Sequence, residues 1–145
     1  MTLIIYHKGT VYADRIVSSN GAVLGQTTKV FLKDNKVIGA CGSAIDCQKF
    51  INLYPNIVYK ETFTEEHSAG FTFFFDQNKP KVQIYKQAGM SEYEILDEIF
   101  AIGLGEEFAL GLLFAGKLPE ETFKLVNMYY PIIHGPIDSI KIPHD

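Results

Sequence analysis

The order of strands and helices is the feature that most restricts the fold of this 145-residue chain. Four β-rich runs come before the first predicted helix, and short turns join them in pairs: 2–6 with 10–17, and 29–32 with 36–41. Strands joined by such short turns pair antiparallel, because a parallel pair needs a long crossover. The sequence therefore predicts an α+β protein with antiparallel sheets rather than a parallel βαβ fold.

The first helix is predicted to begin at Ser43. Its hydroxyl can cap the first turn, and Asp46 stands three residues further on, as in a capping box. Apolar residues then recur at helical spacing from Cys47 to Tyr54, and Pro55 ends the helix. The rest of the chain predicts a hairpin of 71–75 with 81–86, a strand pair or one bent strand over 93–102, helices over 106–115 and 119–129, a last strand over 137–142, and no clear element over 56–68.

Length and composition predict one domain over residues 1–145. Hydrophobic residues make up 47% of the chain, which excludes a disordered protein. The net charge of −4, without a basic stripe, argues against a nucleic-acid partner. The most apolar stretch, 108–115, is too short to cross a membrane, and the first residues do not resemble a signal peptide. Cys41 and Cys47 suit reduced thiols, so we expect a cytoplasmic protein without a membrane partner.

Most catalytic motifs are absent from the sequence, including those of serine hydrolases, phosphate loops, dinucleotide-binding folds and zinc proteases. A turn at Gly103 and Gly105 resembles a phosphate-binding loop, but Glu106 and Glu107 would repel an anion there. The histidines are scattered, and none has the spacing of a metal ligand: His7, His67, His134 and His144. We therefore expect neither a metal nor a cofactor.

The N-terminus offers a different chemistry. Thr2 becomes the first residue once Met1 is removed, and it then carries both a hydroxyl nucleophile and a free α-amine. Because such an amine has a pKa near 8, it can act as a general base at neutral pH without a histidine. This chemistry needs a nearby cation and a carboxylate that holds the cation. Lys29, on the third predicted strand, and Asp14, on the second, are candidates for these roles, although each is also an ordinary structural or surface charge.

Several segments resemble a known family. The start of the chain, MTLIIYHKGTVYAD, resembles the start of proteasome β-subunits and of the bacterial protease HslV, and is similar to short proteasome-like proteins of phages and prophages. Lys29 and the three residues after it resemble the lysine-bearing strand of that family. Residues 39–43 resemble its turn before the first helix, and 101–111 resemble its Ala-Ile-Gly-Ser-Gly motif. The resemblance continues over 116–126 and 135–137, while the stretch from about 55 to 98 is weakly similar.

The resemblance implies an N-terminal nucleophile (Ntn) hydrolase fold, a four-layer α/β/β/α sandwich with two antiparallel sheets, here trimmed because the chain is short. It also implies a threonine hydrolase that cleaves peptide or other amide bonds. Thr2 would be the nucleophile and its amine the proton acceptor. Lys29 would tune the pKa of that amine, Asp14 would orient Lys29, and the Gly42 N–H would face the oxyanion. Other implied properties are a peptide or protein substrate, a homo-oligomer, an ATPase partner by analogy, and a bacterial or phage-infected host cell.

Two departures from the family pattern support an alternative. Leu104 stands where the family has a serine, and Tyr130 stands where it has an acid. These groups help to position the N-terminal amine in the family, so the chain is alternatively a catalytically degenerate protein that acts as an oligomeric binding or scaffold protein. A retained Met1 would also block the amine. A third reading is an unrelated α+β domain.

Overall fold

The computed structural model describes residues 2–19, 22–130 and 135–143, which fall into two units. Unit 1 contains Met1–Lys29 and Leu96–Lys141, and unit 2 contains Val30–Ile95 and Ile142–Asp145. Each unit is therefore built from two separate segments of the chain. The prediction of one domain over 1–145 stays a prediction. Met1, the predicted turn at Asn20 and Gly21, and the histidines His134 and His144 lie outside the described residues.

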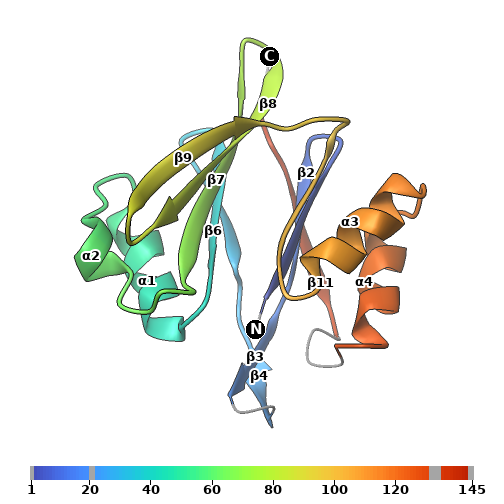
Figure 1. Cartoon of the computed structure of the whole chain (residues 1–145), viewed down its shortest axis with the longest axis horizontal. Coiled ribbons are helices and arrows are strands. Elements are labelled where there is room, and N and C mark those ends of the chain that lie inside the picture. Colours follow the sequence, from blue (N-terminus) through green and yellow to red (C-terminus); the bar gives the residue numbers. More distant parts are fainter. Residues whose placement is uncertain (1, 20–21, 131–134, 144–145) are drawn as a thin grey trace. The chain divides into compact units, whose positions relative to one another are not determined.

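Unit 1 contains a four-stranded antiparallel sheet in the order β10-β1-β2-β11, of which β2 and β11 are labelled in Figure 1. Its strands are β1 (Leu3–His7), β2 (Thr10–Asp14), β10 (Ile99–Gly103) and β11 (Ile137–Lys141). The register aligns Leu3 with Gly103 and Ile137 with Asp14. The predicted pairing of the first two strands is confirmed, and the last predicted strand is present but ends one residue earlier than expected. This pairing brings the start of the chain against two strands that come about a hundred residues later.

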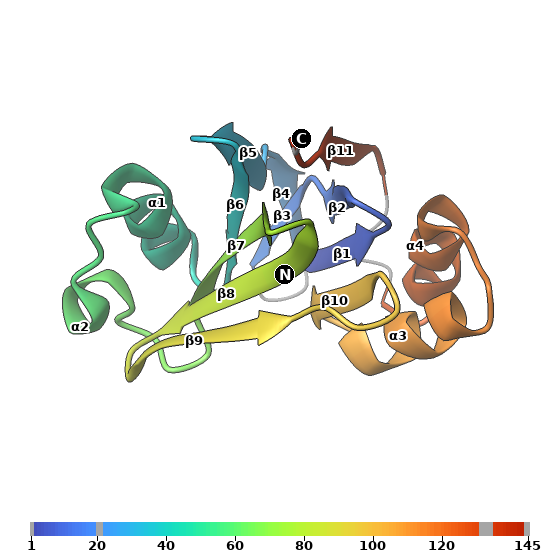
Figure 2. The ribbon, with the colours of Figure 1, turned by 90° about the horizontal axis from the view of Figure 1, so that it is seen from above.

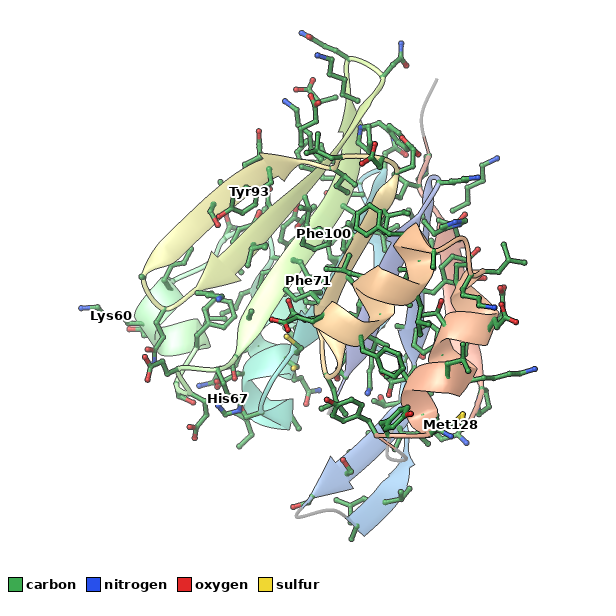
Figure 3. The ribbon with its side chains drawn as sticks, turned by 45° about the vertical axis from the view of Figure 1, so that its right-hand side comes forward. Lys60, His67, Phe71, Tyr93, Phe100 and Met128 are labelled. Carbon is green, nitrogen blue, oxygen red and sulfur yellow. The ribbon has the colours of Figure 1, made fainter. Side chains whose placement is uncertain are left out.

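Two helices cover one face of this sheet, α3 (Glu106–Phe114) and α4 (Pro119–Asn127). They lie side by side in Figure 1, and Figure 3 labels Met128 at the end of α4. Their shared core holds apolar side chains from both helices and from β1 and β10: Leu3, Ile5, Ala101, Ala109, Leu113, Phe123 and Val126. Both helices were predicted, and they end one and two residues earlier than expected.

The predicted strand over 10–17 is wrong, because the structure breaks it into β2 and β3 (Ile16–Ser19) at Arg15. The Asp14 carboxylate accepts a hydrogen bond from the Ile16 N–H at 3.2 Å, which turns the main chain away from the ladder of β2. Strand β3 pairs with β4 (Ala22–Gln26) in a two-stranded sheet of its own. Strand β4 was not predicted, because every residue in it is exposed and it lacks the alternation of buried and exposed side chains.

Unit 2 contains a five-stranded antiparallel sheet in the order β5-β6-β7-β8-β9 (Figure 2). The strands are β5 (Val30–Lys33), β6 (Lys36–Cys41), β7 (Ala69–Asp76), β8 (Lys79–Lys86) and β9 (Gly89–Glu94). Two predicted hairpins are confirmed. The strand pair or bent strand over 93–102 is a wrong prediction, because β9 pairs with β8 while β10 pairs with β1 in the other sheet.

Helix α1 (Ala44–Leu53) follows β6 and lies on one face of this sheet with the short helix α2 (Tyr59–Thr62). The cap is confirmed, since the Ser43 hydroxyl accepts from the Asp46 N–H at 3.2 Å. The capping box is not completed, because the Asp46 carboxylate instead accepts from the Thr64 hydroxyl and the Glu65 N–H. The shared core contains residues of β6, α1, α2–β7 and β8: Ile38, Ala40, Phe50, Tyr54, Phe63 and Tyr85.

The described residues form a mixed α and β fold with antiparallel sheets and four helices. Among these helices, none has the length and the apolar character required to cross a bilayer.

Candidate functional site

Asp14 is the centre of the candidate site in unit 1. It is the last residue of β2 and is completely buried. One carboxylate oxygen, Oδ1, accepts from the Leu3 N–H at 2.9 Å, and the other, Oδ2, accepts from the Ile16 N–H at 3.2 Å and from Lys29 Nζ at 2.6 Å. A buried carboxylate is stable only when such donors compensate for its lost hydration. Asp14 therefore connects the first strand, the start of β3 and the lysine.

Lys29 contributes the positive charge of the site. It was predicted as the first residue of a strand, but β5 begins at Val30 and Lys29 lies in the short segment 27–29 between β4 and β5. Its side chain is only 8% exposed, and its ammonium group forms an ion pair with Asp14. An ion pair this short and this buried holds both groups in one geometry, and loss of either partner leaves an uncompensated charge.

The peptide group between Thr2 and Leu3 is held from both sides. Its nitrogen, the Leu3 N–H, donates to Asp14 Oδ1 at 2.9 Å. Its oxygen, the Thr2 carbonyl, accepts from the Leu104 N–H at 2.7 Å. Because a peptide group is planar, hydrogen bonds at both ends fix its orientation and with it the Cα atom of Thr2. Thr2 itself is nearly buried.

Gly103 makes this contact with Thr2 sterically feasible, a role that the sequence did not predict. It lies opposite Leu3 in the β1–β10 register and has a φ of +111°, which residues with a side chain rarely adopt. A Cβ atom at this position would overlap the Thr2 carbonyl oxygen. The resemblance drew attention to the side chain of Leu104, whereas the structure uses the Leu104 main chain.

The two departures from the family pattern meet at one turn. Gly105, which precedes α3, has a φ of +72°, and a Cβ atom there would lie 3.2 Å from the ring of Tyr130 and 2.9 Å from Val126. Tyr130 therefore packs beside the turn that contains Leu104. The Leu104 side chain cannot form the hydrogen bonds of the expected serine, and Tyr130 has a phenol in place of the expected carboxylate.

Gly42, the predicted oxyanion donor, belongs to unit 2, whereas Thr2, Asp14 and Lys29 belong to unit 1. It follows β6 and has a φ of +114°. A Cβ atom at Gly42 would overlap Ser68, whose hydroxyl accepts from the Ser43 N–H at 3.1 Å. The turn at Gly42 is thus tightly packed, and its role beside Thr2 stays a prediction.

The described histidines lie outside this cluster. His7 is the last residue of β1, and His67 lies in the loop before β7 (Figure 3). Burial lowers the pKa of His7, which favours the neutral imidazole. Within residues 2–19, 22–130 and 135–143, no cluster of histidine, cysteine and acidic side chains could hold a metal ion. The charged side chains that the structure links to the Thr2–Leu3 peptide group are Asp14 and, through it, Lys29.

Comparison with known proteins supports the fold at low sequence identity. The protein BPH of Thiobacillus denitrificans, solved in complex with epoxomicin, has a TM-score of 0.63 and 12% identity over 99% of this chain and 100% of its own. A second BPH structure has a TM-score of 0.62 and 13% identity over 100% of both chains. Anbu (ancestral β-subunit) from Yersinia bercovieri has a TM-score of 0.63 and 10% identity over 98% of this chain and 80% of its own.

No protein-family model matches the chain, and no curated protein is similar to it in sequence. At identities of 10–13%, the structural similarity concerns the fold alone. The resemblance found in the sequence is therefore confirmed at the level of the fold, whereas the likeness to phage proteins stays a prediction. The chain has a proteasome-like fold.

Proposed function

We propose that this protein is an N-terminal threonine hydrolase that cleaves peptide or other amide bonds. The observation that carries the proposal is the Thr2–Leu3 peptide group, held at its nitrogen by Asp14 and at its oxygen by Leu104. The same carboxylate pairs with Lys29. A nucleophile needs such fixed positioning, because a displacement of about 1 Å can cost a factor of about 10² in rate.

In the proposed reaction, removal of Met1 frees the α-amine of Thr2. The amine accepts the hydroxyl proton while the hydroxyl oxygen attacks the substrate carbonyl, and the proton then passes to the leaving amine. Water hydrolyses the resulting ester and regenerates Thr2. Lys29 favours the neutral form of the α-amine by its positive charge, and Asp14 holds Lys29 in place. The Gly42 N–H stabilises the oxyanion in an Ntn-type four-layer α/β/β/α sandwich.

The proteasome-like fold supports this proposal, and the ligand of one similar structure suggests a probe. BPH of Thiobacillus denitrificans was solved in complex with epoxomicin. We expect purified protein to have lost Met1 by intact mass, and to gain the mass of one epoxomicin molecule, mapped to Thr2. The matched control is Thr2→Ala, which keeps the main-chain contacts but has no hydroxyl. Retained Met1, or an adduct that persists in Thr2→Ala, would contradict the proposal.

The alternative function is a catalytically degenerate binding or scaffold protein. Leu104 and Tyr130 favour it, because Leu104 lacks the hydroxyl of the family's serine and Tyr130 lacks the carboxylate of its acid, the two groups that help to position the N-terminal amine in the family. In that case Thr2→Ala would leave assembly and partner binding unchanged, whereas a loss of biological function in this variant would exclude the alternative. Assembly is measured by size-exclusion chromatography with light scattering.

Under either function, we propose a homo-oligomer, since proteasome-like folds are expected to assemble. A peptide or protein is the proposed substrate, and an ATPase that unfolds it is the proposed partner by analogy. The proposed location is the cytoplasm of a bacterial cell or a phage-infected host.

A further inference from the structure

We propose that Arg15 is a positioning residue for Lys29, acting through Thr28. This inference rests on the proposed function, in which Lys29 tunes the Thr2 amine. Lys29 lies in the segment between β4 and β5, outside the regular strands. Arg15, the residue that directly follows Asp14, contacts this segment at two points.

Two contacts from Arg15 reach the segment that carries Lys29. The Arg15 carbonyl accepts from the Thr27 N–H at 2.7 Å, and Arg15 Nη1 donates to the Thr28 hydroxyl at 3.2 Å. The segment is thus attached on both residues that precede the lysine. Because consecutive Cα atoms lie about 3.8 Å apart, a shift at Thr28 is transmitted directly to Lys29.

Asp138 on β11 holds the Arg15 guanidinium in the position from which it donates to the Thr28 hydroxyl. Its Oδ2 atom accepts from the same Nη1 nitrogen of Arg15 at 2.6 Å. Asp138 pairs with Ala13 in the sheet, so the last strand of unit 1 carries the anchor next to Asp14. Both side chains are about 30% exposed, and such ion pairs contribute little to stability. Their value here is geometric, because they fix the one nitrogen that bonds to Thr28.

The Arg15 contacts set the position of the Lys29 ammonium group relative to Asp14 in this proposal. Arg15 and Asp14 are neighbours, and together they hold the lysine from two directions: Asp14 at the ammonium group and Arg15 at the preceding main chain. Without the Thr28 contact, the segment relaxes and the ammonium group moves relative to Asp14. The catalytic rate then falls while substrate affinity is retained, since neither Arg15 nor Thr28 contacts the substrate in the proposed reaction.

The test uses Thr28→Val, which removes the hydroxyl at an exposed position and keeps the shape of the side chain. We expect the rate of epoxomicin attachment to Thr2 at saturation to fall by about 3-fold to 10-fold, the factor that corresponds to one net hydrogen bond. The epoxomicin concentration that gives half of this maximal rate should stay within about 2-fold of the wild-type value, the scatter expected for sites that do not interact. Thr28→Ser keeps the hydroxyl and lacks the methyl group, so it should retain the wild-type rate. If the packing of the methyl group mattered instead, Thr28→Ser would be slow and Thr28→Val would not. Arg15→Ala should produce at least the loss seen in Thr28→Val.

A second measurement does not depend on activity. Competitive labelling with acetic anhydride, measured by mass spectrometry, reports how accessible each lysine amine is. Lys29 should be labelled about 3-fold faster or more in Thr28→Val and Arg15→Ala. Lys33, which donates to the Tyr54 carbonyl in unit 2, is the internal control and should not change. Lys81→Ala, which removes partly exposed ion pairs with Asp76 and Glu92 in unit 2, controls for general loss of charge.

The two measurements separate the possible failures. If wild-type Thr2 does not react but Lys29 labelling rises in the variants, the proposed function fails and the positioning contact stands. If Thr2 reacts in wild type and neither its rate nor Lys29 labelling changes in Thr28→Val, the role of Arg15 is refuted. A rise in Lys29 labelling that also occurs in Lys81→Ala would refute it as well.

Discussion

Replacing Asp14 by asparagine tests the centre of the site most directly. The substitution keeps the shape and one oxygen, which can still accept from the Leu3 N–H. The other oxygen becomes an amide nitrogen, a donor that faces the Ile16 N–H and the Lys29 ammonium group, both of them donors themselves. The variant therefore loses two hydrogen bonds and leaves the nearly buried Lys29 charge without its carboxylate.

The expected cost follows from this geometry. Breaking one partner of a buried ion pair destabilises a protein by about 3–5 kcal/mol. We expect Asp14→Asn to lower the free energy of unfolding by this amount in urea denaturation followed by circular dichroism. The control is Asp138→Asn, in the partly exposed pair with Arg15, which should cost no more than about 1 kcal/mol.

A double-mutant cycle separates the unpaired charge from the lost packing. Lys29→Met removes the charge and keeps the hydrocarbon stem, so Asp14→Asn combined with Lys29→Met should be more stable than the sum of the single effects by about 1–3 kcal/mol. The reasoning is refuted if Asp14→Asn costs no more than Asp138→Asn, or if the two effects simply add.

Three further outcomes follow from the geometry. Gly103→Ala should abolish the attachment of epoxomicin to Thr2 and destabilise the protein by about 1–3 kcal/mol, because a Cβ atom would displace the Thr2 carbonyl; wild-type attachment would contradict this. Gly42→Ala should lower the melting temperature by several degrees in a thermal shift assay, since its Cβ atom would overlap Ser68 at a positive φ, and an unchanged melting temperature would argue against tight packing there. Burial raises the pKa of Asp46, but hydrogen bonds, chiefly from the Thr64 hydroxyl, outweigh it and lower the pKa from 3.8 to about 2. Because the folded pKa lies below the unfolded one, this stabilisation is present above pH 3.8 and is lost as the pH falls toward 2, so urea titrations from pH 5 to 2 should show a smaller decline in Asp46→Asn than in wild type.

Much of the architecture could be predicted because a hairpin has a local sequence signal, a short turn between two runs of strand-forming residues. The turns around Gly9 and between 71–75 and 81–86 separate runs of strand-forming residues, and α1 begins with a capping serine. Exposed strands leave no such pattern, so β4 was missed. Strand β9 ends at Glu94 and β10 begins at Ile99, and sequence adjacency alone could not show that they pair with different sheets.

The candidate site also contains residues that could be predicted from the sequence and residues that could not. Thr2, Asp14 and Lys29 could be proposed because their side chains have the chemistry that an N-terminal nucleophile needs. The contacts of Gly103 and Leu104 with the Thr2 carbonyl could not be predicted. They need a residue without a Cβ atom and a main-chain N–H at positions that are set by the register of β1 against β10. Arg15 was missed for a related reason, since its partners Thr28 and Asp138 are distant in sequence.

The pairing of β1 with β10 also has a consequence for the timing of folding. Leu3 meets Gly103 across a hundred residues of chain, and β2 meets β11 across a still longer stretch in the register of Asp14 with Ile137. Contacts of such high contact order form late, because the entropy of closing a long loop must be overcome first. During synthesis on the ribosome, the Thr2 carbonyl cannot accept from the Leu104 N–H until residue 104 has emerged. The anchoring of Thr2 is therefore completed only after most of the chain has been made.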